Sequence, residues 1–466
     1  MHRQLGPIVA LGLLAATSLL GCATRQLAPG DAAPAGSELQ LASFDHAWQR
    51  VAETHPLEDM GGLDWEAVRD ELRPAAARAT RASELRPVLG QMLARLGDSH
   101  YGVLPGTDSD LSFQVARARR SRMAVGRPQW RLEPAPITLD SLGQGDLGLS
   151  CHLVGDEVLV TRVSPDGPAH QAGVLPGFVV ERIDGQSVRG VLGALSEMGL
   201  TGSALHLRLQ TLLTEALEGL PGTTVDLALI DQVGGLRRLS LKREPSQQQV
   251  VSFGHLTSLP VETESRVLDA GVGYVRFNIF MPAIVGPFNE AIQGFIDRRS
   301  PGVVLDLRGN PGGVGAMVMG LAGRFVAERG KSLGTMQTRE TQLRFFANPR
   351  ARSERFEGPV AILVDDLSAS TSEIFAGGLQ EMGRVRVFGL RSAGMALPSL
   401  VEELPNGDRL QFVTADFTTP GGRRLEGQGV EPDAVVPHSR EHLLSGEDAA
   451  LSAAVAWILA QQGASS

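Results

Sequence analysis

The chain has 466 residues, of which 42% are apolar, so it is long enough for several domains that each bury a core. Its formal net charge is −9, and only four Trp and two Tyr are present, which excludes a basic surface interleaved with aromatic residues. Nucleic acid is therefore not an expected partner. No Cys or His spacing typical of a metal site occurs, and we expect neither a metal nor another cofactor.

The start of the chain has the pattern of an export signal. His2 and Arg3 precede an apolar run that is too short to span a bilayer, and the run ends at Leu-Leu-Gly-Cys. Residues 1–22 resemble a bacterial lipoprotein signal peptide, which implies that Cys22 is acylated and anchors the chain to a membrane. We expect a lipoprotein of the cell envelope that is anchored in the outer membrane and faces the periplasm, or that is exposed on the cell surface. Cys151 then has no disulfide partner, and its apolar surroundings indicate a buried side chain.

Two segments follow the signal. Residues 23–40 are rich in Ala, Pro, Gly and Ser, which predicts a flexible tether. Residues 41–105 have apolar side chains at helical spacing, which predicts a helical N-terminal domain. This domain ends in a loop that contains Ser99 and His100. The mixed pattern of residues 107–145 supports no assignment.

Residues 146–245 read as short strands joined by turns, and they resemble a PDZ domain. PDZ domains add an extended peptide as a strand and bind its terminal carboxylate with backbone N–H groups. The resemblance implies that Leu147, Gly148 and Leu149 form the peptide-binding loop. The turns that carry the likeness are Ser164–Ala169, Ala172–Val174 and Pro176–Gly177.

Predicted strands alternate with predicted helices from Gly271 onward, which indicates parallel strands joined by right-handed crossovers. We expect an α/β domain over residues 265–440 and a C-terminal helix over residues 441–466. The expected strands are 272–277, 303–307, 360–364 and 385–388, and the expected helices are 284–298, 314–326 and 372–382.

A hydroxyl-rich turn separates the strand 360–364 from the helix 372–382, and Ser370 lies in this turn. The unpaired N–H groups at a helix N-terminus favour negative charge, so the position suits a nucleophilic serine. The same residues, Ser370–Glu373, also fit a Ser-x-x-Glu capping box, which merely starts a helix. On this segment alone, capping is the better-supported interpretation.

The order of several motifs resembles that in the serine peptidase family of the C-terminal processing peptidases and tricorn protease. The likeness covers nearly the whole mature chain. It implies a multidomain protein with an N-terminal helical region, a PDZ-like β domain and a C-terminal α/β peptidase domain of the ClpP/crotonase-like type. It also implies polypeptide substrates. The motifs are Trp65–Val68, the PDZ-like segment, Leu305–Gly313, Ser368–Glu373 and Glu426–Asp433.

The resemblance implies that Ser370 is the nucleophile. In the processing peptidases a lysine in a downstream Gly-Lys-Gly segment is the base, but Met395 stands at this position and accepts no proton. In the tricorn branch the base is a His preceded by Ser, and a later Glu completes the set. The matching residues are Ser99, His100 and Glu426. We expect His100 to be the base, oriented by Ser99, which Glu426 steers in turn.

A Gly-rich turn, Asn310–Gly313, follows the expected strand 303–307. Because it lacks bulky side chains, its backbone can approach a substrate carbonyl closely. We expect Gly312 and Gly313, with the N–H of Thr371, to form the oxyanion hole. A tight strand-to-helix corner without a catalytic role is an equally open interpretation of this turn.

The sequence therefore predicts an exported serine endopeptidase that forms an acyl-enzyme, with the PDZ-like domain selecting or gating extended or C-terminal segments. One alternative is a catalytically inactive peptide- or ligand-binding lipoprotein of the same fold, or an adaptor that delivers substrates to another protease. Another is a hydrolase of non-peptide esters. No feature of the sequence indicates an oligomeric state.

Overall fold

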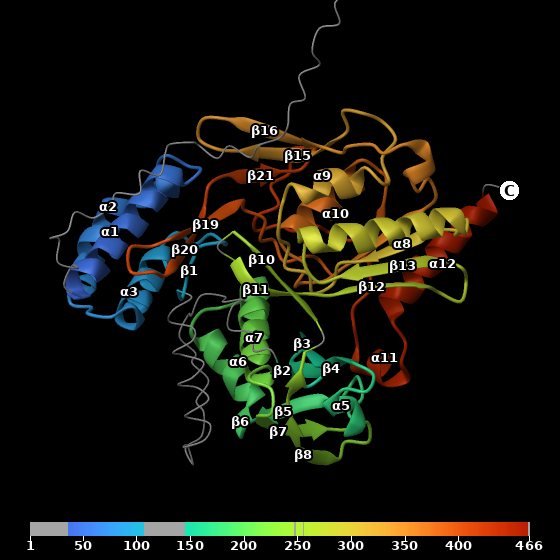
Figure 1. The fold of residues 1–466 in the computed structure, drawn as a ribbon, viewed down its shortest axis with the longest axis horizontal. Helices are drawn as coiled ribbons and strands as arrows, with labels where there is room; N and C mark the ends of the chain where they lie inside the picture. The colour runs from blue at the N-terminus through green and yellow to red at the C-terminus, as the bar shows by residue number, and fades with distance from the viewer. Residues whose placement is uncertain (1–35, 107–144, 247, 255, 465–466) are drawn as a thin grey trace, which may run out of the picture. The chain divides into compact units, whose positions relative to one another are not determined.

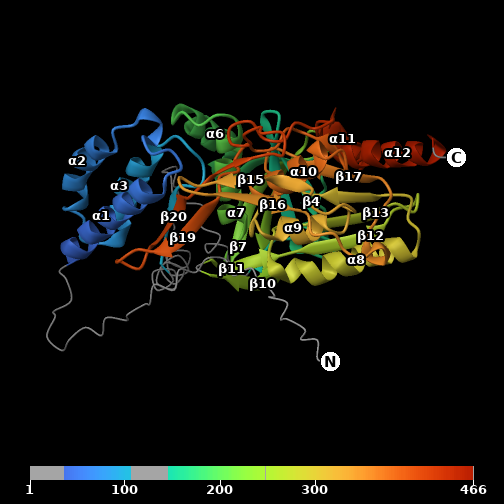
Figure 2. The same cartoon turned by 90° about the horizontal axis from the view of Figure 1, so that it is seen from above.

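The computed structural model describes residues 36–106, 145–246, 248–254 and 256–464 (Figures 1 and 2). Cys22 and the expected signal peptide lie outside the described residues. Within the described part of the chain, no helix is both long and apolar enough to cross a membrane. The N-terminal helical region comprises α1 (Gly36–Thr54), α2 (Trp65–Ala76) and α3 (Ala82–Ala94).

Helix α1 begins earlier than the sequence predicts. A tether is expected over residues 23–40, but residues 36–40 are helical. Gln40 is only 4% exposed, and its side-chain oxygen accepts a hydrogen bond from Asn406 Nδ2 at 2.8 Å. This contact with a distant turn holds the segment in the helix, although the composition of the region favours a flexible chain.

Strands from a later part of the chain complete the helical region. Strand β1 (Gly102–Leu104) pairs antiparallel with β20 (Arg409–Val413), which pairs in turn with β19 (Ser399–Glu403). Leu410 and Phe412 of β20 are fully buried and share one core with Phe44 of α1 and Leu89 of α3. The helical region therefore has no closed core of its own.

Residues 145–245 form a six-stranded sheet in the order β3-β4-β5-β7-β8, with β6 paired to β5. Helices α6 and α7 pack against it, whereas the sequence predicts only strands and turns here. The apolar spacing of Leu205, Leu209 and Leu213 on α7 is a helical signal that the interpretation missed. The strands of this sheet are β3 (Leu149–Val154), β4 (Glu157–Val163), β5 (Val179–Ile183), β6 (Gln186–Ser187), β7 (Thr224–Ile230) and β8 (Leu236–Lys242), and the helices are α5 (Pro168–Gln171), α6 (Val188–Glu197) and α7 (Gly202–Leu217). Strands β2 (Gly145–Asp146) and β9 (Glu244–Pro245) pair with each other in a separate two-stranded sheet.

The C-terminal half contains a six-stranded sheet in the order β12-β13-β14-β17-β18-β22. Its strands are parallel except β12, which runs antiparallel to β13, and the alternation of strands and helices is as predicted. The strands are β12 (Thr263–Val267), β13 (Gly273–Phe277), β14 (Val303–Asp306), β17 (Val360–Val364), β18 (Arg386–Gly389) and β22 (Ala434–Val435), and the helices are α8 (Val285–Asp297), α9 (Met317–Ala322), α10 (Thr371–Glu381), α11 (Arg440–Ser445) and α12 (Ala449–Ala464).

Helices cover both faces of this sheet (Figure 1). Leu305 and Ile362 point to the face covered by α8, α9 and α10, where they pack with Phe375. Val304 and Leu363 point to the opposite face, which α12 covers. Because both faces are covered, the central strands are apolar on both sides. The remaining strands are β10 (Gln249–Phe253), β11 (Leu256–Val261), β15 (Ser332–Gln337), β16 (Gln342–Phe346) and β21 (Asp416–Thr418).

Two helices differ from the expected bounds. Helix α9 covers Met317–Ala322 rather than 314–326, because the main chain of Asn348 crosses its end so closely that only Gly323 fits there. The C-terminal segment is not one helix: α11 ends at Ser445, followed by Gly446 with a left-handed φ of +73°, and α12 begins at Ala449.

Candidate active site

Ser370 lies where the buried strand β17 turns into helix α10. Its φ is +54°, a region that residues with side chains rarely adopt, and its ψ is −116°. A serine on such a sharp strand-to-helix turn presents its hydroxyl outward. Ser370 is partly exposed, whereas Thr371 and Ser372 beside it are buried. The N–H of Ser370 also donates to Glu373 Oε2 at 3.0 Å, so the helix-capping contact is present as well.

Hydroxyl groups tie the Ser370 turn to the Gly-rich turn that follows β14. Ser368 Oγ donates to the Leu307 carbonyl at 2.8 Å. Ser372 Oγ donates to the Asn310 carbonyl at 2.9 Å. Since β14 and β17 are neighbouring parallel strands, their carboxyl ends meet at the same edge of the sheet, where ligands of open α/β sheets bind.

The two expected oxyanion donors of the Gly-rich turn, the N–H groups of Gly312 and Gly313, differ in their hydrogen bonding. The N–H of Gly312 donates to Asn310 Oδ1 at 2.9 Å, so this expected oxyanion donor is already engaged in the structure. The N–H groups of Gly313 and Thr371 have no hydrogen-bond acceptor among the described residues. Thr371 Oγ1 donates to the Gly313 carbonyl at 2.8 Å, which makes the two residues neighbours. Two such donors beside a serine can stabilise an oxyanion.

Gly312 instead contributes the space that its missing side chain leaves. A Cβ atom at this position would lie 2.7 Å from Ser370 Cβ and 2.8 Å from the N atom of Thr371. The φ of Gly312 is +104°, which side chains other than hydrogen rarely allow. The turn therefore lies too close to the backbone of Ser370 and Thr371 for a residue with a Cβ atom at position 312.

Ser99, His100 and Glu426 form a connected chain of polar contacts. Ser99 Oγ lies 2.6 Å from His100 Nδ1, and the N–H of Ser99 donates to Glu426 Oε1 at 3.1 Å. Glu426 Oε2 accepts the N–H of Ala396 at 2.7 Å. The structure thus brings together three of the four expected tetrad residues, in the predicted order. With Nδ1 engaged by Ser99, His100 Nε2 is the ring nitrogen left for another partner.

Burial sets the charge of these groups. It lowers the pKa of His100 to about 4, so the imidazole is neutral at pH 7 and can accept a proton. Burial also raises the pKa of Glu426, against the hydrogen bonds from Ala396 and Ser99 that lower it.

His100 and Ser370 share no hydrogen bond in the described structure. The loop 392–396 lies between them and touches both sides. Ala396 binds Glu426 on the histidine side, while the N–H of Ser370 donates to the Met395 carbonyl at 2.7 Å. Adjacent residues of this loop, Met395 and Ala396, therefore connect the Ser370 side of the candidate site to the His100 side. Catalytic hydrogen bonds are often long without substrate, and the arrangement is compatible with that state.

The expected peptide-binding loop Leu147–Leu149 lies at the start of β3, which is an edge strand. The N–H of Gly148 donates to Asp146 Oδ1 at 2.8 Å, so this donor is already engaged. The Leu147 carbonyl accepts the N–H of Ala169 at 3.0 Å. Cys151 on the same strand is buried, as expected, and burial raises its thiol pKa to about 12.

Helix α7 contacts the segment that leads to the nucleophile candidate. His206 Nδ1 forms a short contact with Asp366 Oδ2. Asp366 and Leu367 also line a small cavity with Leu153 of β3 and with His206 and Leu209 of α7. Its volume is about 10 Å³, roughly enough for one water molecule.

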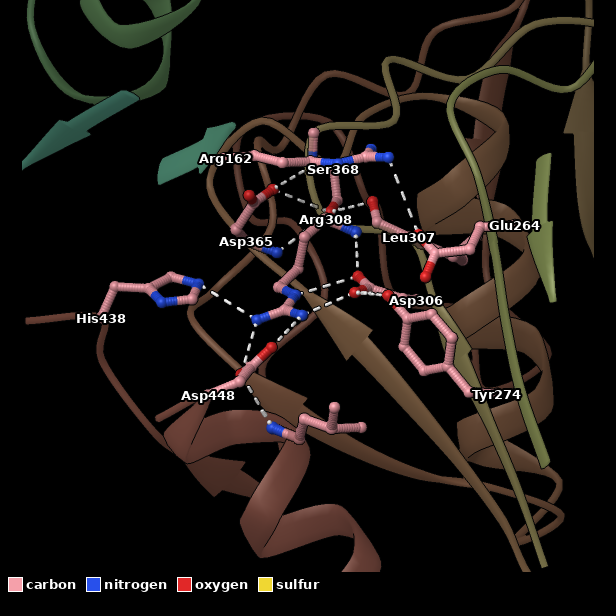
Figure 3. Close-up of polar contacts among 12 residues, drawn as sticks. Arg162, Glu264, Tyr274, Asp306, Leu307, Arg308, Asp365, Ser368, His438 and Asp448 are labelled. Atoms are coloured by element: carbon pink, nitrogen blue, oxygen red, sulfur yellow. Dashed lines mark hydrogen bonds and ion pairs between the residues drawn. The ribbon is translucent and has the colours of Figure 1, made fainter. Parts of the chain in front are cut away.

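Arg308, in the turn after β14, joins the edge of the sheet to the start of α12 (Figure 3). Its guanidinium donates to both oxygens of Asp448, at 2.9 and 2.7 Å, and its Nε donates to Asp306 Oδ1 at 2.9 Å. Asp306 also accepts the Tyr274 hydroxyl. Burial raises the pKa of Asp306, but the Arg308 contacts outweigh it and hold this pKa below its usual value. His438, which the sequence leaves without a role, lies 3.2 Å from Arg308.

Sequence reasoning missed residues that hold the site without facing it. Asn310 binds Gly312 through its side chain, and Glu373 gathers hydrogen bonds from four groups. Both residues lie inside the motifs that carry the family resemblance, and this position was the only signal available.

Known proteins resemble two parts of this chain. Residues 271–436 match the model of peptidase family S41, and residues 41–94 match that of the tricorn protease C1 domain. The "Probable CtpA-like serine protease" of Staphylococcus aureus strain COL is 24% identical over 290 residues, which are 62% of this chain and 52% of the relative. The protein of the same name from Staphylococcus haemolyticus is 25% identical over 281 residues. The chain thus spans about half the length of these curated relatives.

Solved structures share the fold. The photosystem II D1 C-terminal processing protease is similar with a TM-score of 0.52 and 23% identity, over 88% of this chain and 98% of that one. Mature CPAF is similar with a TM-score of 0.58 and 13% identity, over 88% and 94%. The two family models and the shared fold thus make the chain similar to peptidase family S41 and to tricorn protease.

Proposed function

We propose that this protein is a serine endopeptidase that cleaves polypeptides through an acyl-enzyme at Ser370. The proposal rests on one observation above all. Ser99, His100 and Glu426 form a connected chain that ends on the loop holding the backbone of Ser370. A binding protein derived from the same fold has no need for a buried neutral imidazole that is linked through one loop to a strained serine, and the alternative of an inactive receptor is not favoured.

The mechanism follows from the positions of these groups. Ser370 Oγ attacks the peptide carbonyl carbon while His100 Nε2 takes its proton. The carbonyl oxygen becomes negative and accepts hydrogen bonds from the N–H groups of Gly313 and Thr371. His100 then returns the proton to the leaving amine, and the C–N bond breaks. A water molecule then attacks the ester carbon while His100 takes its proton. The ester C–O bond breaks, and His100 returns the proton to Ser370 Oγ. Ser99 and Glu426 orient the imidazole throughout.

A fluorophosphonate probe tests this mechanism on the full chain in detergent. We expect the wild type to be labelled, and Ser370→Ala and His100→Ala to lose labelling. His170→Ala is the matched control, because His170 is exposed and its ring binds the N–H of Asp166, in the same turn. This variant should label as the wild type does. A folded wild type that stays unlabelled both alone and with added peptides would favour the receptor interpretation.

We further propose that residues 145–245 act as a PDZ domain that gates the serine. The contact of His206 with Asp366 supports a link, since Asp366 precedes the serine turn. Leu153 of β3 and Leu209 of α7 also line one small cavity together with Asp366 and Leu367, which places both elements against the segment before the serine turn. We expect added peptides to raise the labelling rate, and His206→Ala to reduce that increase. Peptides with free and amidated C-termini distinguish terminal from internal recognition. An unchanged rate with every peptide would refute gating.

We propose that the chain is exported and anchored by lipid at Cys22. The apolar run that ends at Leu-Leu-Gly-Cys supports this proposal. Mass spectrometry of the membrane fraction should find an acylated chain beginning at Cys22, and Cys22→Ser should remove the protein from that fraction. Polypeptide substrates would then be those of the periplasm or the cell surface.

A further inference from the structure

The side chain of Glu373 has an unusual set of partners for a residue in the first turn of a helix. It is 1% exposed, and its carboxylate accepts four hydrogen bonds. Oε1 accepts Ser392 Oγ at 2.5 Å and the N–H of Gly394 at 2.7 Å. Oε2 accepts the N–H of Met395 at 2.9 Å and that of Ser370 at 3.0 Å.

Helix capping explains only one of these four contacts. In a capping box, the carboxylate at this position binds the backbone N–H of the N-cap residue, here Ser370. The other three donors come from the loop 392–396, which is remote in sequence. A carboxylate that merely starts a helix has no need for them and is usually exposed. Glu373 therefore joins the nucleophile candidate to this loop.

The same loop is also held from the histidine side. Ala396 donates its N–H to Glu426, whose other oxygen binds Ser99. Consecutive N–H groups of the loop are thus divided between two buried carboxylates, Glu373 for Gly394 and Met395, and Glu426 for Ala396. The loop carries no base of its own, because position 395 is Met, and it acts on Ser370 through its main chain.

We propose that Glu373 is a positioning residue for the reaction: its carboxylate fixes the main chain of Ser370 against the loop 392–396 and so sets the nucleophile relative to the Ser99–His100 pair. This inference rests on the proposed peptidase function. In it, Glu373 touches no substrate, and it acts through the left-handed backbone of Ser370, which few residues adopt without support.

The ionised form of Glu373 is the one that fits its surroundings. Only an ionised carboxylate accepts all four donors, since a protonated oxygen must itself donate. The groups that face it are the Ser392 hydroxyl and three backbone N–H groups, and in the described structure no charged side chain contacts it. Burial raises its pKa to about 7 against these hydrogen bonds. We therefore expect the positioning to weaken as the pH falls through about 7, where His100 is still neutral.

Glu373→Gln tests the proposal in the full chain, with the rate of fluorophosphonate labelling measured from pH 5 to 8. The Gln amide keeps one acceptor oxygen, but its NH₂ group would face N–H or O–H donors that it cannot bind. We therefore expect labelling at pH 8 to slow by roughly tenfold to a hundredfold. The wild-type rate should fall below about pH 7, and that fall should be absent in the variant. Glu381→Gln is the matched control on the same helix, since Glu381 also accepts a backbone N–H, from Gly421. It should retain both the wild-type rate and its pH dependence.

Hydrogen exchange gives a readout that does not depend on activity. We expect the amides of Ser370, Gly394 and Met395 to exchange faster in Glu373→Gln than in the wild type and in Glu381→Gln. Unchanged exchange, or labelling with the wild-type rate and pH profile, would overturn the proposal. If no form is labelled, the peptidase function fails, and the exchange data still decide whether Glu373 holds the serine turn. Glu373→Asp, which keeps the charge on a shorter side chain, replaces Glu373→Gln if that variant does not fold.

Discussion

His100 is the residue whose burial has the clearest consequence for stability. Its pKa falls from 6.5 to about 4 in the folded chain, so the unfolded chain binds the proton more readily between these values. The contribution of His100 is complete above pH 6.5 and is lost as the pH falls through 4. We expect the free energy of unfolding, measured in urea between pH 4 and 7, to fall less steeply in His100→Gln. Equal slopes would show that His100 is protonated equally in both states.

Glu373 acts in the opposite direction over part of this range. Its pKa is raised from 4.5 to about 7, so its protonated form is favoured in the folded chain. Its stabilising contribution is present below pH 4.5 and is lost as the pH rises through 7. Both His100→Gln and the wild type contain Glu373, and the comparison between them therefore isolates His100. Stability and the proposed positioning make opposite demands on this carboxyl group.

Gly312→Ala should remove the close approach on which the serine turn depends. The new Cβ would lie 2.7 Å from Ser370 Cβ at a φ of +104°. We expect the free energy of unfolding to fall by about 1–3 kcal/mol and labelling to slow at least tenfold. Gly330→Ala is the control, because Gly330 also has a positive φ but no atom within 4 Å of the added carbon. If both variants label equally, the contact between the turns is not required.

At the scale of elements, local sequence patterns predicted the helices and strands that depend on residues adjacent in the chain. The apolar runs of β14 and β17 and the start of α10 follow from sequence alone. The family motifs pointed to Ser99, His100 and Glu426, which the structure places in contact. Contacts between distant segments were not predictable. The pairing of β1 with β20, and the Asn310 side chain that takes the N–H of Gly312, depend on where the folded chain brings each group.

Helix α12 supports the edge of the sheet that carries the site. Asp448 caps the helix by accepting the N–H of Leu451, and it also binds the buried guanidinium of Arg308. Asp448→Asn leaves Arg308 with one carboxylate instead of two. We expect a loss of about 1–3 kcal/mol in the free energy of unfolding, reduced by the partial exposure of Asp448. Urea unfolding measures it, and Asp297→Asn, at an exposed helix end, should change little.

At the scale of the whole molecule, the site depends on two parts of the chain that are remote in sequence. His100 follows the N-terminal helices, whereas Ser370 belongs to the α/β sheet. Asp408, which is 1% exposed, holds the first part to the strands β19 and β20. Both its oxygens bind Arg86 of α3, at 2.9 and 2.8 Å, and one also accepts the N–H of Gly106. A base and a nucleophile carried by separate segments react only while such contacts fix their distance.

Asp408→Asn tests whether this attachment sets the reactivity of the serine. The amide cannot pair with both nitrogens of Arg86 as a carboxylate does, so the segment between α3 and β1 should loosen. We expect faster proteolytic cleavage there and slower labelling of Ser370, while hydrogen exchange in β14 and β17 stays unchanged. Glu357→Gln, which removes an ion pair with Arg355 outside this attachment, is the control. Normal labelling despite a loosened segment would mean that the attachment is not required, because the contact of Ser99 with Glu426 would then suffice to keep His100 within reach of Ser370.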